Sequence, residues 1–266
     1  MSNDNWGSVA RIGIFVVGAE VVPEAEWWAM SPPGVSVHAA RVTAETPWAQ
    51  WKADREIVVL APDLERGAAQ FASMALSAVV LAHSSSSIMG GPGWDDAVTA
   101  CLQPCLHGST AVTTNGLDCA RALRQCGVRR PFIVFPPWFT ADTMRVGAAY
   151  FSGHGFQQSG LHRQVPEPRW SDVRPQDLYK NLMHIQQNAD LLFDQIVANC
   201  SSSADGVLIV GTGLRCVGII GALEAELGRP VVTANQASLW RCLSLAEVDT
   251  PVTGYGQLLA GPRDTR

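Results

Sequence analysis

Short apolar runs alternate with longer segments of helical periodicity along the 266-residue chain. The apolar runs are rich in β-branched residues, which is typical of buried strands, and strands separated by helix-length segments indicate parallel βαβ units. The pattern therefore predicts an α/β fold. The predicted strands are residues 10–17, 78–82, 111–113, 132–135, 206–210 and 230–233, and the predicted helices are residues 64–76, 94–106, 116–126, 140–151, 175–199, 216–227 and 236–245.

The two halves of the chain resemble each other. Residues 108–123 match residues 228–243 at six of sixteen positions with an offset of 120, and a second alignment has an offset of 128. Two halves built on one plan predict two Rossmann-like lobes with parallel sheets, related by a pseudo-twofold axis and separated by a cleft. The alignments pair Asn115 with Asn235 and His83 with Gly211. The predicted lobes are residues 1–115 with 230–266, and residues 116–229.

Each half carries a loop of small residues between a predicted strand and a predicted helix. Such a loop leaves backbone N–H groups unpaired beside the positive end of the helix dipole, and this arrangement suits a carboxylate or an oxyanion. Neither loop matches a nucleotide-binding pattern, and ordinary serine and glycine loop chemistry is the alternative for each. The candidate substrate-binding groups are Ser84, Ser85 and Ser87 in the first loop, and Gly211, Thr212, Gly213 and Leu214 in the second.

Two titratable residues accompany these loops. His83 lies at the end of a predicted strand, where its side chain can face the cleft and exchange protons near neutral pH. Glu20 follows the first strand at the same edge of the sheet, where it can orient His83 or bind an amine or amide. A hydrogen-bonded structural histidine and a solvated glutamate are the alternatives.

Charge and cysteine content narrow the function classes. The net charge of −5 is spread without acidic or basic blocks, so we expect neither a nucleic-acid partner nor a membrane partner. The first apolar run lacks a basic flank and is too short to span a bilayer, which predicts a cytoplasmic protein.

Seven cysteines without a CxxC pair are typical of reduced thiols. Cys101, Cys105 and His107 lack a fourth ligand, so no metal site is predicted. Four tryptophans lie near the N-terminus, and they could form a core cluster or a contact between copies in a homo-oligomer. They are Trp27, Trp28, Trp48 and Trp51.

Three segments resemble the aspartate/glutamate racemase superfamily, within it the branch of maleate isomerases and arylmalonate decarboxylases. They are SSSSIMGGPGWD at residues 84–95, TTNGLDCARALRQCGVRRPFIVFPPW at 113–138, and GTGLRCVGIIGALEAELGRPVVTANQASLW at 211–240. The resemblance implies two Rossmann-like lobes, a small-molecule substrate and chemistry without a cofactor, in which thiols move protons while loop amides and hydroxyls hold a carboxylate or enediolate.

The chain departs from the family pattern at the site itself. The first cysteine position falls on His83, or on Ser84 if the strand is the anchor, and the second falls on Gly211. A family tyrosine corresponds to Trp138 and a family asparagine to Glu20. These departures argue against two-thiol racemisation or cis-trans isomerisation, and a carboxylate at residue 20 argues against a small dianionic substrate.

The leading hypothesis is a cofactor-independent acid/base enzyme on a small carboxylate or carbonyl compound, a decarboxylase-like lyase or isomerase acting through an enediolate-type intermediate. His83 would donate and accept the proton, with Glu20 as its partner. Trp138 would form part of the pocket wall, and Asn235 would orient a loop. The serine and Thr212 hydroxyls and the amides of the second loop would hold the oxyanion. Two alternatives stay open: a hydrolase or hydratase in which His83 and Glu20 activate water, and a non-catalytic ligand-binding protein.

Overall fold

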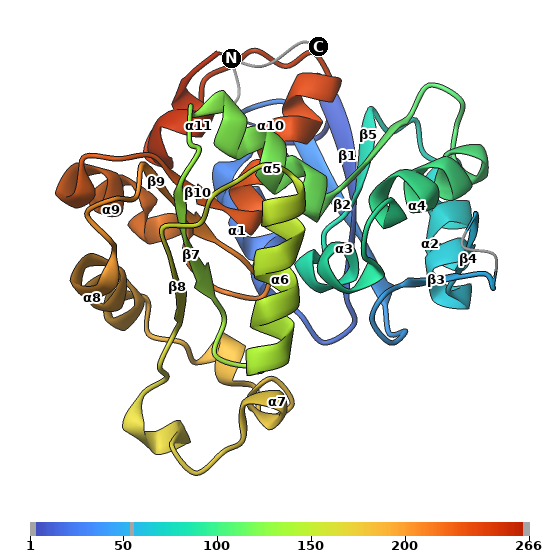
Figure 1. Ribbon diagram of the computed structural model, residues 1–266. Helices are drawn as coiled ribbons and strands as arrows, with labels where there is room; N and C mark the ends of the chain where they lie inside the picture. The colour runs from blue at the N-terminus through green and yellow to red at the C-terminus, as the bar shows by residue number, and fades with distance from the viewer. Residues whose placement is uncertain (1–3, 54–55, 263–266) are drawn as a thin grey trace.

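Two parallel sheets form the centre of the molecule (Figure 1). The computed structural model describes residues 4–53 and 56–262. The strand order is β2-β1-β5-β6 in the first sheet and β10-β9-β7-β8 in the second, which confirms the α/β fold with parallel sheets. The first sheet contains β1 (Ala10–Val17), β2 (Val35–Val42), β5 (Ala78–Leu81) and β6 (Ala111–Thr114), and the second contains β7 (Pro131–Phe135), β8 (Gly160–Arg163), β9 (Gly206–Ile209) and β10 (Val231–Thr233). A small antiparallel pair, β3 (Ala49–Trp51) and β4 (Val58–Leu60), packs against the helices α3 (Ser84–Gly90) and α4 (Trp94–Leu102).

The two sheets are built on the same plan. In each, the strand that comes first along the chain pairs on one side with the second strand and on the other side with the third, which pairs in turn with the fourth. β9 begins 128 residues after β5, and β10 begins 120 residues after β6, which are the offsets of the sequence repeat. The predicted pseudo-twofold relation between two Rossmann-like lobes is therefore confirmed.

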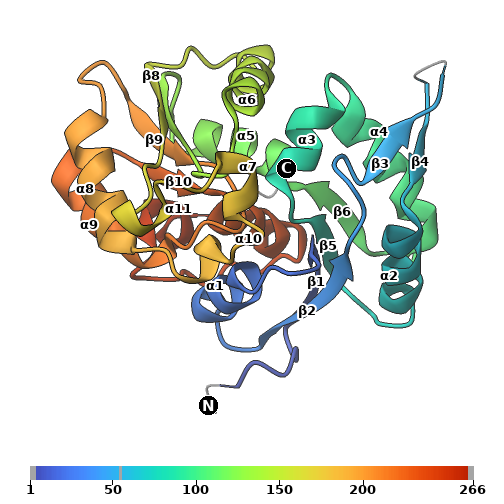
Figure 2. The same ribbon diagram turned by 90° about the horizontal axis from the view of Figure 1, so that it is seen from below.

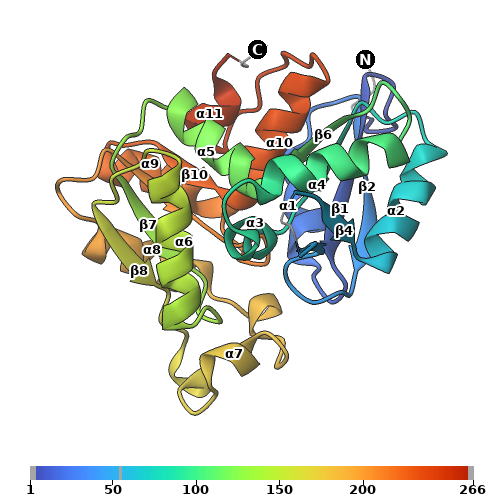
Figure 3. The ribbon, with the colours of Figure 1, turned by 45° about the vertical axis from the view of Figure 1, so that its right-hand side comes forward.

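Helices cover the sheets and join the lobes (Figure 3). α5 follows β6 of the first sheet and packs against β9 and β10 of the second, whereas α10 follows β10 and packs against β5 and β6. The two helices also pack against each other. The helices are α1 (Val22–Met30), α2 (Pro62–Ala72), α3 (Ser84–Gly90), α4 (Trp94–Leu102), α5 (Asn115–Gln125), α6 (Ala141–Gly153), α7 (Pro175–Leu178), α8 (Ala189–Asn199), α9 (Ile220–Leu227), α10 (Ala234–Leu245) and α11 (Gly256–Ala260). Short 3-10 turns lie at Gln103–Cys105, Pro168–Trp170, Met183–Ile185 and Val217–Ile219.

One strand crosses the predicted division into lobes. β10 pairs with β9 in the second sheet, although its residues fall in the segment 230–266 that was expected to belong to lobe one. The chain returns to the first lobe with α10, which also packs against α1.

The single helix predicted over residues 175–199 is wrong. The chain forms α7, then a 3-10 turn, and starts α8 only at Ala189. Leu182 has a left-handed backbone conformation with φ of 62°, which a continuous helix excludes. The Asn188 side chain accepts hydrogen bonds from the backbone N–H groups of Asp190 and Leu191, so it begins a new helix. The segment around α7 consequently projects from the second lobe, as Figure 1 shows.

The tryptophans divide between core and surface. Trp27 and Trp48 are fully buried, which favours the core interpretation for these two, whereas Trp28 is exposed. Within the described part of the chain, no helix combines the length and apolar character that crossing a membrane requires.

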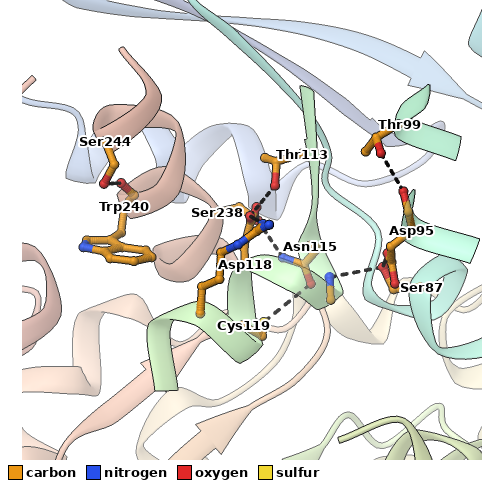
Figure 4. Close-up of polar contacts among 12 residues, drawn as sticks. Ser87, Asp95, Thr99, Thr113, Asn115, Asp118, Cys119, Ser238, Trp240 and Ser244 are labelled. Atoms are coloured by element: carbon orange, nitrogen blue, oxygen red, sulfur yellow. Dashed lines mark hydrogen bonds and ion pairs between the residues drawn. The ribbon is translucent and has the colours of Figure 1, made fainter. Parts of the chain in front are cut away.

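A buried polar network joins the lobes where α5 meets α10 (Figure 4). Asn115 Nδ2 donates to the carbonyl oxygen of Ala234 at 2.8 Å and to Ser238 Oγ at 2.9 Å. Ser238 Oγ in turn donates to Asp118 Oδ2 at 2.9 Å. Burial raises the pKa of Asp118 to about 7, although hydrogen bonds from Thr113 and Ser238 oppose the shift.

Ser238→Ala should lower the free energy of unfolding by about 1–3 kcal/mol, because it removes a donor from the buried Asp118 carboxyl group. Ser244→Ala is the matched control: Ser244 is buried on the same helix, but its hydroxyl bonds only to the Trp240 carbonyl one turn earlier. This control should cost about 1 kcal/mol or less. Urea unfolding measures both, and equal losses would contradict a special role for the network.

Candidate active site

The two loops of the repeat meet at a cavity of about 210 Å³. The cavity lies at the carboxyl ends of the strands, where ligand sites of open parallel sheets are found. Most of the predicted site residues line it together, and Val17, Thr46, Phe139 and Tyr179 complete the wall. The predicted residues in the wall are Glu20, His83, Ser84, Ser85, Trp138, Gly211, Thr212 and Gly213.

His83 stands at the start of α3 and is held from two sides. Its ring stacks on Trp48 with 4.4 Å between ring centroids, and its Nδ1 lies 2.9 Å from Ser86 Oγ. Ser86 Oγ also accepts the backbone N–H of Trp48 at 3.0 Å, so the serine proton is available for Nδ1. With the serine as the donor, the imidazole proton lies on Nε2. Although part of the side chain faces the cavity, burial lowers the pKa of His83 to about 3, so the ring is neutral at pH 7.

The serines of the first loop have different surroundings. Ser84 is buried, and its Oγ donates to Asn115 Oδ1 at 2.6 Å and accepts the Gly211 N–H at 3.2 Å. Ser85 is partly exposed and faces the cavity. Ser87 was expected in the substrate site, but its hydroxyl donates to Asp95 Oδ1 at 2.6 Å and does not line this cavity. The reason is helical geometry, which turns successive side chains of α3 to different faces.

The second loop supplies backbone donors. Among the described residues, the N–H groups of Thr212 and Gly213 have no acceptor. The N–H of Leu214 donates to the Gly211 carbonyl at 3.1 Å, and Leu214 is fully buried, so its predicted role as an oxyanion donor has no support in the geometry. Gly211 has φ of +99°, and a Cβ added there would lie 2.9 Å from Pro136 Cγ. A side chain at this position is therefore strained.

Asn235 holds the second loop from behind. Its Nδ2 donates to the Thr212 carbonyl at 2.8 Å and to Glu26 Oε2 at 2.7 Å. Glu26 Oε1 accepts the N–H groups of Cys216 and Val217 at 2.7 and 3.0 Å. The geometry supports the predicted orienting role of Asn235, and it adds Glu26, which no pattern in the sequence had indicated.

Glu20 is a buried acid in the cavity wall, with 3% of its surface exposed. Its Oε2 accepts the Thr212 hydroxyl at 3.3 Å, and a Cβ added to Gly213 would overlap its Oε1. The Tyr179 hydroxyl faces the carboxyl group closely enough to lower its pKa, although its geometry falls short of a hydrogen bond. Burial outweighs both hydroxyls and raises the pKa of Glu20 to about 8.

The two candidate catalytic residues share the cavity without contacting each other through a hydrogen bond. Among the described residues, the His83 ring bonds to Ser86 and the Glu20 carboxyl to Thr212. The geometry thus gives no direct support to Glu20 as the orienting partner of His83.

An aromatic cluster closes the cavity on the side of α7. The Trp138 ring packs edge-on against Tyr179 with 5.5 Å between centroids, and Tyr179 stacks on His184 at 4.4 Å. Tyr179 comes from the segment that follows α7, which Figure 2 shows over the junction of the lobes. No strand-end or loop pattern points to Tyr179 in the sequence, so its place in the wall was missed.

The chemistry of the wall is that of a carboxyl group, a neutral imidazole, hydroxyls and backbone donors. None of the lining residues is a cysteine, a lysine or an arginine. Cys216 follows the second loop but is buried with its N–H bonded to Glu26. Within the described residues, no group of three or more His, Cys, Asp or Glu side chains is placed to hold a metal ion.

Comparison with known proteins gives one family. A family model described as arylmalonate decarboxylase matches residues 59–259. The maleate isomerase Iso from Pseudomonas putida S16 aligns with a TM-score of 0.78 at 18% identity, over 95% of this chain and 98% of that chain. The Nocardia farcinica maleate cis-trans isomerase bound to TRIS gives a TM-score of 0.74 at 18% identity, over 95% and 98% of the two chains. A crystal structure of arylmalonate decarboxylase gives a TM-score of 0.71 at 21% identity, over 94% and 98%. No curated protein matches the chain.

Glu20 should make stability fall as pH rises. Its pKa is about 8 in the folded protein against 4.5 normally, so the folded state binds the proton more tightly than the unfolded state between these values. The contribution is complete below pH 4.5 and is lost as pH rises through 8. Glu20→Gln should therefore reduce the loss of unfolding free energy between pH 5 and 9 by about 2–4 kcal/mol.

Denaturant unfolding at a series of pH values measures this slope. Glu226→Gln, an exposed substitution on α9, is the control and should leave the slope unchanged. A Glu20→Gln protein with the wild-type slope would show that the carboxyl group is not buried as described.

Proposed function

Since the chain belongs to the arylmalonate decarboxylase family, we propose that it is a cofactor-independent lyase or isomerase acting on a small carboxylate through an enediolate-type intermediate. The observation that carries the proposal is the carboxyl group of Glu20, buried in the cavity wall beside the unpaired N–H groups of Thr212 and Gly213. A proton source and an oxyanion site thus face the same small space.

The second loop is the proposed oxyanion site. Its N–H groups are fixed before substrate binds, because Asn235 holds the Thr212 carbonyl and Ser84 holds the Gly211 N–H. Donors that need no rearrangement stabilise a developing negative charge most effectively, and removing one typically costs about 10²- to 10³-fold in rate. Ser85 of the first loop faces the same cavity and adds a hydroxyl donor.

Glu20 is the proposed proton donor. With a pKa near 8 it is mostly protonated at pH 7 and can still lose the proton, whereas the imidazole of His83, with a pKa near 3, is a poor proton carrier there. The sequence suggested His83 as the proton carrier and Glu20 as its partner, and we propose the reverse assignment. Glu20 transfers the proton, and the neutral His83 donates a hydrogen bond through Nε2–H.

The proposed substrate carries, on one carbon, a carboxylate that leaves, a second carboxyl group that becomes the enediolate, and an apolar substituent. Without lysine or arginine in its wall, the cavity offers only neutral donors to an anion, so the carboxyl groups of the substrate are held by hydroxyls and backbone N–H groups and not by ion pairs. Trp138, Phe139 and Tyr179 provide aromatic surface for the substituent. The volume of about 210 Å³ is below the roughly 300–1,000 Å³ of sites for drug-sized ligands, so the substrate is small.

In the lyase reaction, the bond between the reacting carboxylate and its carbon breaks and carbon dioxide leaves. The bonding electron pair passes into the carboxyl group that remains on the same carbon, and this group becomes the enediolate whose oxygens the second loop stabilises. Glu20 gives its proton to the carbon and is protonated again from water. A single proton donor serves one face of the intermediate, so this geometry favours decarboxylation over racemisation. The N. farcinica isomerase, in contrast, has been crystallised with a covalently bound succinylcysteine, and no cysteine lines the cavity here.

A proton-NMR screen in D₂O tests the proposal with arylmalonates, maleate, amino acids and small amides. We expect an arylmalonate to lose a carboxylate and gain one deuteron at carbon. Glu20→Gln should lower turnover by about 10²-fold or more. The wild-type rate should fall as pH rises through about 8, because Glu20 loses the proton that it must donate.

His83→Gln and His83→Ala separate the two possible roles of the histidine. Both lose the ring stacked on Trp48, but glutamine keeps an N–H donor. If His83 donates a hydrogen bond, the glutamine variant should be at least 10-fold faster than the alanine variant. Equal loss in both would restore His83 as the acid/base group. Solvent oxygen-18 in the product would support a hydrolase instead, and saturable binding without turnover would support a ligand-binding protein.

A further inference from the structure

A second cavity of about 320 Å³ lies on the other side of α3 and shares no lining residue with the first. Its lining comes mainly from the turn joining α3 to α4 and from the helix α6. The helices α6 and α3 lie side by side (Figures 1 and 3). Its volume falls within the range of small-molecule sites. Ile88, Leu117 and Val146 form an apolar wall.

The polar end of this cavity holds a buried carboxylate without a cation. Asp95 is 4% exposed and accepts the Ser87 hydroxyl on Oδ1 at 2.6 Å and the Tyr150 hydroxyl on Oδ2 at 2.8 Å. Figure 4 shows the Ser87 and Asp95 side chains directed at each other. Both partners are neutral, and no ion pair of the described residues includes Asp95. Asp95 lies in the first turn of α4, so the helix dipole and the two hydroxyls offset part of its charge. Neither supplies a full positive charge, with which buried charges in proteins are normally paired.

The remaining polar residues also suit a cation. Asp96 lies exposed at the rim and brings a second negative charge. Burial lowers the pKa of His154, although Asp95 and Asp96 oppose the shift, so its ring is mostly neutral at pH 7. Arg124 is close by, but it donates to the His154 carbonyl at 2.7 Å and lies over the Phe156 ring, outside the lining of the cavity.

Aromatic rings complete the binding surface. The Tyr150 and His154 rings lie 4.6 Å apart at one end of the cavity. The face of an aromatic ring attracts an ammonium group, and its apolar area favours a hydrocarbon body.

We propose that this cavity is a second ligand site for a small primary ammonium compound with an apolar or aromatic body. The ammonium group would pair with Asp95, with Asp96 at the entrance, and the body would lie against Ile88, Leu117 and Val146. The site is independent of the reaction catalysed at the first cavity. Because His83 and Ser84 begin the helix whose other end walls this cavity, an occupant contacts the same α3 that carries the first loop.

Benzylamine, which is a cation at pH 7, is the probe, and benzyl alcohol is its uncharged analogue. Isothermal titration calorimetry or saturation-transfer NMR should show benzylamine binding at least 10-fold more tightly than benzyl alcohol. Asp95→Asn, which keeps the shape of the side chain, should weaken benzylamine binding by at least 10-fold, and Asp96→Asn by about 3-fold.

Two controls locate the binding. Asp142→Asn, at an exposed position on the same helix as Tyr150, should leave the affinity unchanged. Glu20→Gln should also leave it unchanged, since Glu20 is the buried acid of the first cavity. Equal affinity for the amine and the alcohol would overturn the proposal, as would loss of binding in Glu20→Gln. If Asp95→Asn does not fold, unchanged binding in Asp96→Asn combined with no preference for the charged probe would likewise overturn it.

Discussion

The hydroxyl of Ser84 connects the two loops of the candidate site with the helix α5. It accepts the N–H of Gly211 from the second loop and donates to Asn115, whose amide reaches the start of α10. One buried oxygen thus links both loops and both of the helices that cross between the lobes. The equivalent asparagine of the other half, Asn235, holds the Thr212 carbonyl. Each asparagine of the repeat thus holds one loop from behind, Asn115 through Ser84 of the first loop and Asn235 through Thr212 of the second.

Three buried acids surround this junction, and Asp118 is the one among them with an ion pair within the described residues, to Arg121 at 3.8 Å. Glu20, Glu26 and Asp118 are satisfied by hydroxyls, amides and backbone N–H groups, and burial raises the pKa of each. Glu26 and Asp118 have all their contacts within the protein framework, where they connect loops and helices. Glu20 differs because it also borders the cavity. The same burial that raises the pKa of the framework acids also raises the pKa of a carboxyl group that borders the cavity.

The sequence predicted the repeated framework well, because strand ends and helix starts leave local patterns. Apolar runs indicated the β5 and β9 strands, and the internal alignment showed that they occupy equivalent places, as do Asn115 and Asn235. Edge strands such as β2 and β8 were missed, since their partly exposed faces give no continuous apolar run. Tyr179 was missed because a tertiary contact with Trp138 and His184, and not a local pattern, places it at the cavity. The directions of Ser87 and of the Leu214 N–H depend on the turn of a helix and on a loop hydrogen bond, and spacing does not report either.

The backbone of Gly211 also limits how this protein can change over evolutionary time. Any side chain there must adopt a left-handed conformation and approach the ring of Pro136. A mutation that placed a thiol at this position would first have to be tolerated as a folding defect, before a thiol could contribute to catalysis. A reactive side chain at residue 211 is therefore harder to acquire in a single substitution than one at a position without this backbone constraint.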